Sequence, residues 1–327
     1  MAGPSVTPAA PGRADPGQAA PPVHRRLEIG ACAFFVLMQC AVWLRSAGSL
    51  TVLEHVQTAL IVAHYSAWLG LAAFSSDAWW RRWRRAVAAS RVLIGLLPIT
   101  RSLTVGAAVM LGRPATPGLL GAGGDYLRVG MGTRVLQLPL TGLLLQQPPL
   151  ALLLEHAVQS ALLSSNALYC RSVLLQDPLS RRRMAWAWAA LDWLPQLMPL
   201  SSLRGSGAEP DGWPGASDTQ CIALLNMHQL CCGVLLPVVA AALLAPHGAG
   251  QQMAAQLQQP QQAPGGCAAT LQKRAARLWA AAESALWAAC RGEGLGDMPR
   301  VLLACMFLGN CWLLCQVAAG RNSTTTL

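Results

Sequence analysis

The run CIALLNMHQLCCGVLLPVVAAALLA, residues 221–245, decides the class of this protein, because it contains no Asp, Glu, Lys or Arg. A helix rises 1.5 Å per residue, so a run of this length can cross the ~30 Å hydrocarbon core of a bilayer. Lipid offers no partners to backbone N–H and C=O groups, so a spanning segment must satisfy them within itself. The run therefore predicts a membrane-spanning helix.

The rest of the chain has the same character. Of 327 residues, 54% are hydrophobic and only 12% are charged, which exceeds what a soluble core of this size needs. The other windows long enough to cross are 27–44, 51–74, 86–111, 149–175, 184–203 and 300–319. We expect an all-α, multi-pass transmembrane helical bundle of about seven spans, within a range of about six to eight, over residues 25–245 and 300–319.

Two low-complexity segments flank the predicted spans. Residues 1–24 are rich in Pro and Ala, and residues 246–269 are rich in Gln. Such compositions bury little apolar surface, so we expect a disordered tail and a linker. The segment 270–291 then has apolar residues at helical spacing with basic residues beside them. It predicts an amphipathic helix on the cytoplasmic leaflet, or alternatively a soluble helix packed on the loops.

The net charge of +10 is distributed in clusters. They fall on alternate predicted loops, whereas the loop 204–219 carries three acidic residues. The positive-inside rule then predicts a cytoplasmic N-terminus. Basic stretches between apolar spans face lipid headgroups, so the bilayer is the expected partner and nucleic acid is not. The clusters are Arg25 and Arg26; Arg81, Arg82, Arg84 and Arg85; Arg181, Arg182 and Arg183; and Lys273, Arg274 and Arg277.

Two stretches resemble one another, VLEHVQTAL at 52–60 and LLEHAVQSAL at 153–162. When they are aligned, the following basic clusters and Leu-Pro pairs also recur in the same order. This predicts a parallel duplication of a two-helix unit over 51–111 and 149–203; the alternative is coincidence in a chain dominated by Ala and Leu. The segment 135–147 between them is too short to span and contains Pro139, so we expect a re-entrant or interfacial piece.

Each stretch carries an adjacent Glu and His: Glu54 with His55, and Glu155 with His156. Both pairs are expected one turn inside the non-cytoplasmic ends of their helices. Three interpretations are open: helix capping with interfacial anchoring, a polar vestibule, and haem ligation by His55 with His156 or His228. Haem needs two imidazoles that face one cavity, which nothing in the sequence indicates, so no cofactor is predicted.

Several polar residues are expected near the middle of the bilayer. A charge at that depth usually pairs or lines water. Arg101 and Asp192 have opposite charges, so we predict an ion pair between them, either as structure or as part of a solute or proton path in which His64 titrates. The candidate buried polar cluster is His64, Arg101 and Asp192; Ser164, Ser165, Asn166 and Asn310 lie at similar depth.

Motifs of soluble enzymes are mostly missing from the sequence. There is no GxxxxGK[ST], HExxH or GxSxG pattern, and the segment 121–134, although rich in Gly, suggests a flexible connector. The single lysine, Lys273, lies outside every predicted span, so a retinal Schiff base has no candidate. The eleven cysteines form no CxxC pair, so we predict no metal site. Eight of them lie within or at the edge of apolar windows, and we expect these to act as small hydrophobic residues: Cys32, Cys40, Cys170, Cys231, Cys232, Cys305, Cys311 and Cys315.

Three classes of function remain. A membrane scaffold or partner-binding protein would have its polar residues sealed and paired. A small-solute or proton-coupled transporter would have a water-accessible path through the bundle. A membrane-embedded enzyme would need a reactive constellation, for which Asn226 with His228 is the only candidate. We favour the scaffold, with no enzymatic activity expected.

Overall fold

A computed structural model describes residues 23–76, 78–80, 83, 86–87, 90, 94, 97, 106–145, 147–162, 166–193, 217–244, 267–291 and 296–324. Every regular element in these ranges is helical. The elements are α1 (Val23–Ser46), η1 (Ala47–Ser49), α2 (Val52–Phe74), α5 (Gly106–Leu111), α6 (Gly118–Gly132), α7 (Gln137–Leu145), α8 (Pro149–Leu162), α9 (Asn166–Cys170), α10 (Val173–Gln176), α11 (Pro178–Asp192), α12 (Asp218–His228), η4 (Gln229–Leu235), α13 (Leu236–Leu244), α15 (Cys267–Arg291) and α16 (Asp297–Thr324).

Among the described residues, four helices are long and apolar enough to cross a membrane. They are Arg25–Ser49, Val52–Phe74, Asp218–Leu243 and Val301–Gly320. They coincide with the predicted windows 27–44, 51–74, 221–245 and 300–319. The all-helical class is therefore confirmed, and these helices are compatible with insertion into a membrane.

The helices α1 and α2 form a hairpin with its own hydrophobic cluster. The Nε–H of Arg25 donates to the carbonyl of Ala72 (2.6 Å), and its guanidinium also donates to the carbonyl of Ser75. These bonds satisfy carbonyls that the last turn of α2 would leave without partners. Within the hairpin, the ring of Phe35 stacks on Tyr65 at 5.5 Å. Local capping and aromatic packing therefore stabilise this pair.

The segments α8 and α9 run antiparallel to the long helix made by α12, η4 and α13. His156 in α8 contacts Gly233 near the middle of that helix, and Asn166 at the start of α9 contacts Gln229. Cys170 at the end of α9 then meets Cys221 near the start of α12. As the residue numbers increase along α8 and α9, the numbers of their partners in the long helix decrease. The two segments are therefore antiparallel.

The last helix, α16, packs along α12. The side-chain amide of Asn226 donates to the carbonyl of Cys315 (3.5 Å), and the buried ring of Trp312 meets Trp188 of α11 edge to face at 4.8 Å. Trp312 and Cys315 belong to the main hydrophobic cluster, which also contains Tyr169 and Cys170 of α9. The C-terminal half of α16 is therefore part of the core.

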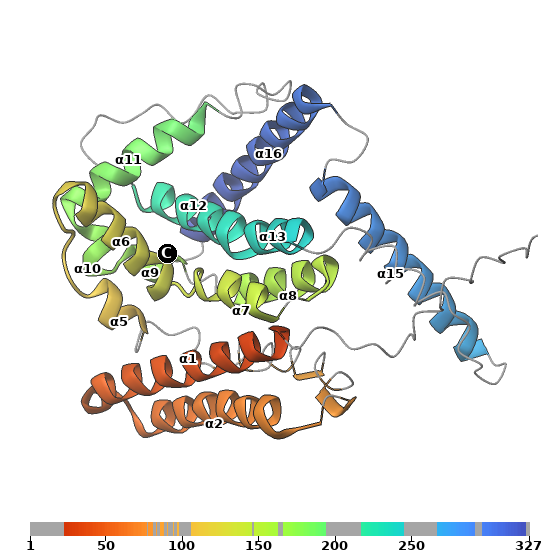
Figure 1. Ribbon diagram of the computed structural model, residues 1–327. Helices are drawn as coiled ribbons and strands as arrows, with labels where there is room; N and C mark the ends of the chain where they lie inside the picture. Colours follow the sequence, from red (N-terminus) through yellow and green to blue (C-terminus); the bar gives the residue numbers. More distant parts are fainter. Residues whose placement is uncertain are drawn as a thin grey trace, which may run out of the picture.

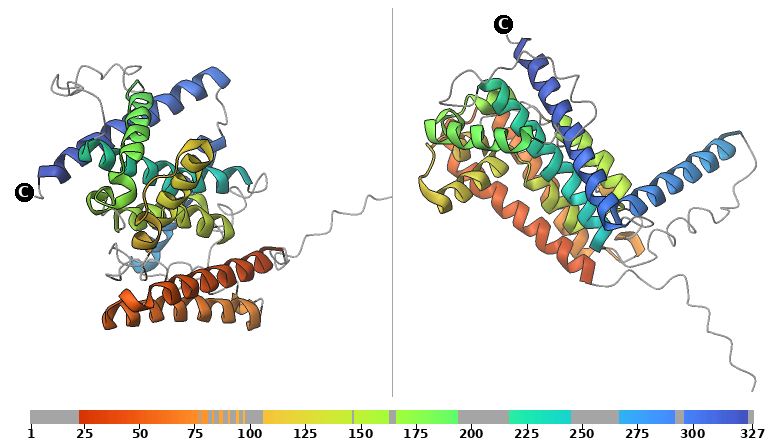
Figure 2. Two further views of the ribbon diagram at one scale, coloured as in Figure 1. Left: turned by 90° about the vertical axis from the view of Figure 1, so that its left-hand side faces the viewer. Right: turned by 90° about the horizontal axis from the view of Figure 1, so that it is seen from above.

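In the right-hand view of Figure 2, α1, α12–α13 and α16 run along roughly one direction in projection, while α15 leaves the bundle crosswise. Figure 1 shows that α1 and α16 lie on opposite sides of α12–α13. In Figure 1 the turn between α1 and α2, the end of α9 and the start of α12 lie at one end of the bundle, on the left. The end of α2, the end of α13 and the docked end of α15 lie at the other. The bundle thus has two distinct ends.

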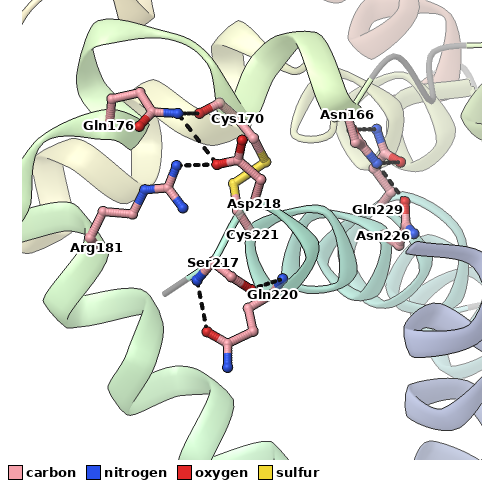
Figure 3. Close-up of a disulfide and its surroundings, with 10 residues drawn as sticks. All are labelled: Asn166, Cys170, Gln176, Arg181, Ser217, Asp218, Gln220, Cys221, Asn226 and Gln229. Carbon is pink, nitrogen blue, oxygen red and sulfur yellow. Dashed lines mark hydrogen bonds and ion pairs between the residues drawn. A yellow bond between two sulfur atoms is a disulfide. The ribbon is translucent and has the colours of Figure 1, made fainter. Parts of the chain in front are cut away.

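One predicted crossing is not a candidate span in the structure. Helix α11 covers only part of the window 184–203, ending at Asp192; residues 194–203 lie outside the described residues. Arg181 of α11 forms an ion pair with Asp218, so the cluster 181–183 and residue 218 lie at the same end of the bundle (Figure 3). The prediction that they lie on opposite sides is wrong, because an arginine neutralised by an aspartate is a weak signal of the cytoplasmic side.

The other windows are resolved in part. The window 149–175 contains α8, α9 and α10, with residues 163–165 outside the described ranges, and most of 86–105 is also outside them. The count of about seven spans and the duplication are therefore not confirmed. The segment 121–134, expected to be a flexible connector, is mostly helix α6, and the segment 135–147 contains the short helix α7.

Candidate polar site in the bundle

The long helix changes its hydrogen-bond pattern at its centre, where η4 is a π-helix. The N–H of Leu236 donates to the carbonyl of Cys231, five residues earlier, rather than four. Such segments are rare and are frequent at functional sites. Several buried polar side chains of the bundle lie around this segment, among them Asn166, Gln229 and His156.

Three amide side chains form a closed cluster beside η4. Asn166 Nδ2 donates to Asn226 Oδ1 (2.7 Å) and to Gln229 Oε1 (2.9 Å), and Gln229 Nε2 donates back to Asn166 Oδ1 (3.1 Å). Asn166 and Gln229 are both buried. Figure 3 shows the three side chains converging from α9, α12 and η4. Because buried amides cost free energy unless paired, this cluster fixes the register between the helices.

His156 is fully buried against the same π-helix. Its Nδ1 lies 2.8 Å from the carbonyl oxygen of Gly233, and because a carbonyl only accepts, Nδ1 must carry the hydrogen. On the other side, a Cβ added to Gly142 of α7 would lie 2.8 Å from Cε1 of His156. Only glycine at position 142 therefore allows α7 to approach this ring.

His228 is the last residue of α12, directly before η4, and its ring is covered by Tyr126 of α6. The two rings stack at 5.0 Å with planes 9° apart, and the hydroxyl of Tyr126 lies 3.4 Å from Sγ of Cys232. Nε2 of His228 is buried and has no hydrogen-bond partner in the part of the chain that the structure describes. Asn226 bonds to Asn166 instead, so the two residues considered for an enzyme have separate partners.

An ion cluster ties α6 to α11 at the disulfide end of the bundle. Asp125 accepts from the N–H of Thr116 and from the guanidinium groups of Arg128 and Arg183, each at 2.8 Å. Burial acts to raise the pKa of Asp125, but these hydrogen bonds outweigh it and hold the pKa below the ordinary value of 3.8. Arg128 also donates to the carbonyls of Met110 and Arg113, so the cluster closes the loop after α5.

A second buried carboxylate docks α15 on the opposite end. Glu283 is 2% exposed and accepts from the backbone N–H of Leu150 in the first turn of α8 (3.0 Å) and from the indole of Trp287 (3.0 Å). Burial raises the pKa of Glu283, while the two hydrogen bonds act in the opposite direction. Arg291 donates to the carbonyl of Ala242 at the end of α13 (3.2 Å). The end of α15 thus caps α8 and contacts α13.

The predicted cluster of His64, Arg101 and Asp192 is only partly described. His64 lies on α2 with its ring centroid 5.5 Å from Tyr65 and 6.2 Å from Trp68. Asp192 is the last residue of α11 and accepts from Nε2 of Gln316 (3.3 Å). Arg101 lies outside the described residues, so its ion pair with Asp192 stays a prediction.

The two Glu-His pairs have different surroundings. Glu54 completes a capping box with Thr51 at the start of α2, and Trp43 donates to Nδ1 of His55 (2.8 Å). Glu155 lies inside α8 and accepts from Gln159 of the same helix (3.3 Å), next to the buried His156. The first pair therefore has the geometry of helix capping, and the second lies away from the end of its helix. A shared vestibule stays a prediction.

A disulfide joins Cys170 and Cys221, with their Cα atoms 6.0 Å apart (Figure 3). The expectation that the cysteines of the apolar windows act as small hydrophobic residues is wrong for Cys170, and Cys221 was not among the cysteines considered. Their separation of 51 residues gave no signal, because no local motif links them. Gln229 and Gly233 were also missed, since neither residue type stands out within an apolar run. Asn166 was recognised as a deep polar residue, but its partners were not.

In comparisons with known proteins, no family model matches the chain, and no curated protein or solved structure matches it.

Proposed function

We propose that this protein is an integral membrane scaffold or partner-binding protein whose helical bundle has a sealed polar interior. The observation that carries the proposal is the closed amide cluster of Asn166, Asn226 and Gln229. A transport path needs polar groups that face water, whereas these amides bond to one another. Paired buried amides specify one packing of the helices, which suits a rigid support for a partner.

We further propose the orientation of the bundle. Disulfides persist in oxidising compartments, so the end with Cys170 and Cys221 faces away from the cytoplasm. The opposite end has Arg25 at the start of α1 and Arg291 at the docked end of α15, and α15 also carries Arg274 and Arg277, which fits the cytoplasmic side. The N-terminus is then cytoplasmic, and α8–α9 crosses the membrane beside α12–α13.

The crosswise direction of α15 in Figure 2 supports its assignment to the cytoplasmic surface. The exposed residues of α15 include Arg274, Arg277 and Leu278. The only acidic residue of α15, Glu283, is buried where this helix contacts the start of α8. A helix with basic and apolar groups free at the surface suits the interface with anionic lipid.

A small-solute or proton-coupled transporter is the second candidate. The observation in its favour is Nε2 of His228, which is buried at the π-helix without a hydrogen-bond partner among the described residues. An imidazole at this position could exchange a proton if water reached it. Access of water to the interior therefore distinguishes the two functions.

The native cysteines provide the test. Cys231 lies in η4 and Cys315 lies buried on α16, so both report on the interior without substitution. Folded protein in membranes is treated with a membrane-impermeant maleimide, and labelled positions are identified by mass spectrometry. A sealed scaffold predicts no label on Cys231 or Cys315 until the protein is unfolded, while Gly48→Cys, exposed in η1, reacts at once. Labelling of either native cysteine in the folded protein would instead support a path.

A further inference from the structure

The helix α16 exposes a polar side chain at the middle of its apolar run. Asn310 is the tenth residue of the candidate span Val301–Gly320, and it is exposed. Among the described Asn and Gln residues of the four candidate spans, no other is exposed. Hydrocarbon forms no hydrogen bond, so an amide at this depth is costly unless a polar partner covers it.

The other deep amides have partners within the chain. Asn226 and Gln229 bond to Asn166, and Gln316, further along α16, donates to Asp192. The side chain of Asn310 forms no hydrogen bond with any residue that the structure describes. A partner for Asn310 therefore has to come from outside the chain.

Four large apolar residues lie on the same face of α16 as Asn310. Leu303, Phe307, Leu314 and Val317 are each 50% exposed or more. Together with Asn310 they are spaced four, three, four and three residues apart along the helix. This is the a/d spacing of a coiled coil, in which one helix packs against another along a narrow line of residues. We call these five residues the α16 seam.

The opposite face of α16 is already buried in the bundle. Trp312, Cys315 and Ala319 are buried and belong to the main hydrophobic cluster. In Figure 1, α16 lies on the side of α12–α13 away from α1. Because the α16 seam is exposed, a further helix can pack on it without displacing any helix that the structure describes.

We propose that a second copy of this chain packs against the α16 seam, with the two Asn310 side chains bonded to one another. A side-chain amide contains both donors and an acceptor, so two Asn side chains related by a twofold axis satisfy each other. Copies in one membrane have the same orientation, so their α16 helices run parallel. Equivalent a/d positions of parallel helices meet at the axis, and one polar residue among them fixes the register.

This inference rests on the proposed function only in that α16 crosses the membrane. It does not depend on the sealed interior. A protein that is monomeric but keeps Cys231 and Cys315 protected from maleimide would overturn the dimer and leave the scaffold proposal standing.

Oxidative cross-linking in membranes tests the α16 seam. Leu303→Cys and Val301→Cys are placed singly in a full chain that keeps Cys170 and Cys221 and has alanine at its other cysteines. Both positions are exposed and lie at nearly the same depth. Two residues turn a helix by about 200°, so only position 303 faces the second copy. Membranes from expressing cells are oxidised with copper phenanthroline, and a covalent dimer of the chain is expected for Leu303→Cys alone.

The role of Asn310 is tested with the purified full chain in phosphatidylcholine vesicles. Energy transfer between copies that carry a fluorescent donor or acceptor protein at the N-terminus gives the Kd of the dimer as the protein is diluted in lipid. Asn310→Leu should raise this Kd about tenfold, because the reciprocal hydrogen bonds are lost. Asn310→Gln keeps an amide and should dimerise more tightly than Asn310→Leu.

Thermal unfolding of dilute monomer in detergent separates association from folding. Asn310→Leu should keep the wild-type Tm, since its amide has no partner within the described residues. A loss of several degrees would assign Asn310 to the fold of one copy and overturn the proposal.

Three other results would also overturn it. The first is an equal yield of dimer from Leu303→Cys and Val301→Cys. The second is a cross-linked product of Leu303→Cys with a different protein in place of the dimer. The third is a Kd that is the same for Asn310→Leu and the wild type, or an absence of energy transfer at every density, which would show that the α16 seam meets lipid only.

Discussion

At the scale of single residues, the glycines show where helices approach most closely. A Cβ at position 142 would lie 2.8 Å from Cε1 of His156 and 2.9 Å from Cδ1 of Leu152, both of which are buried. Neither neighbour can move freely in a packed interior. The contact between α7 and α8 therefore depends on the absence of one methyl group.

Gly142→Ala should destabilise the folded protein by roughly 1–3 kcal/mol, the usual cost of overpacking. Thermal or denaturant unfolding in detergent measures the change. Gly123→Ala is the matched control, because a Cβ there meets nothing within 4 Å and position 123 is exposed on α6. The control should be neutral or gain up to about 1 kcal/mol of helix propensity. Equal losses in both variants would contradict the contact.

Asp125 gives a prediction about pH. Its pKa is lower in the folded state than its ordinary value of 3.8, so its ion cluster stabilises the fold above pH 3.8. That stability should disappear as the pH falls from 3.8 through the lower folded value. Asp125→Asn should be less stable than wild type at pH 7 and should lose less stability over the acidic interval. Parallel curves for the two proteins from pH 7 to pH 2 would show that the cluster contributes nothing.

The sequence predicted some of these residues through their chemistry. Polar residues inside apolar windows, such as Asn166 and His156, were recognisable because burial demands a partner. Their partners were not recognisable, because Gln229 and the carbonyl of Gly233 lie far away in the chain. Asp125 was missed since its neighbours in sequence suggested a flexible connector, whereas it lies on helix α6 and bonds to Arg128 and Arg183.

At the scale of helices, the docking of α15 depends on one carboxylate. Glu283 accepts hydrogen bonds from α8 and from Trp287 on its own helix. Its Oε2 takes the place of an N-cap acceptor for Leu150, a role usually filled by a residue just before the helix. An element distant in sequence therefore completes the start of α8.

Glu283→Ala should cost about 1–2 kcal/mol, because it leaves a backbone N–H and an indole N–H without partners. Glu283→Gln keeps an acceptor oxygen and should lose less. Amide hydrogen exchange at the first turn of α8 and along the end of α15 measures the effect, with faster exchange expected at both in the alanine variant. Unchanged exchange at Leu150 would show that the carboxylate is not its cap.

Apolar periodicity and length predicted the helices well where the run was continuous, as in 51–74 and 221–245. They failed in the window 184–203, where α11 begins with Asp177 as its N-cap and carries three arginines. A hydropathy average depends only on residue types, so it is the same whether or not those arginines have carboxylate partners. The partners of two of them, Asp125 and Asp218, come from distant segments.

At the scale of the whole molecule, the bundle has two chemically different ends. One end has the disulfide and the paired arginines of α11, and the other has the docked end of α15 and the start of α1. The sequence alone supplied the charges and the apolar runs. The sequence alone could not show which loops lie at the same end of the bundle, because that depends on the pairing of α8–α9 with α12–α13.

Labelling from each side of the membrane tests this arrangement most directly. Gly48→Cys and Gly296→Cys are placed singly in a chain that keeps Cys170 and Cys221 and has alanine at its other cysteines; both positions are exposed and have room for a side chain. In sealed membrane vesicles whose cytoplasmic face is outward, an impermeant maleimide should label position 296, and should label position 48, at the end with the disulfide, only after the vesicles are opened. Labelling of both positions from the same side, or of position 48 alone in the sealed vesicles, would contradict the proposed topology.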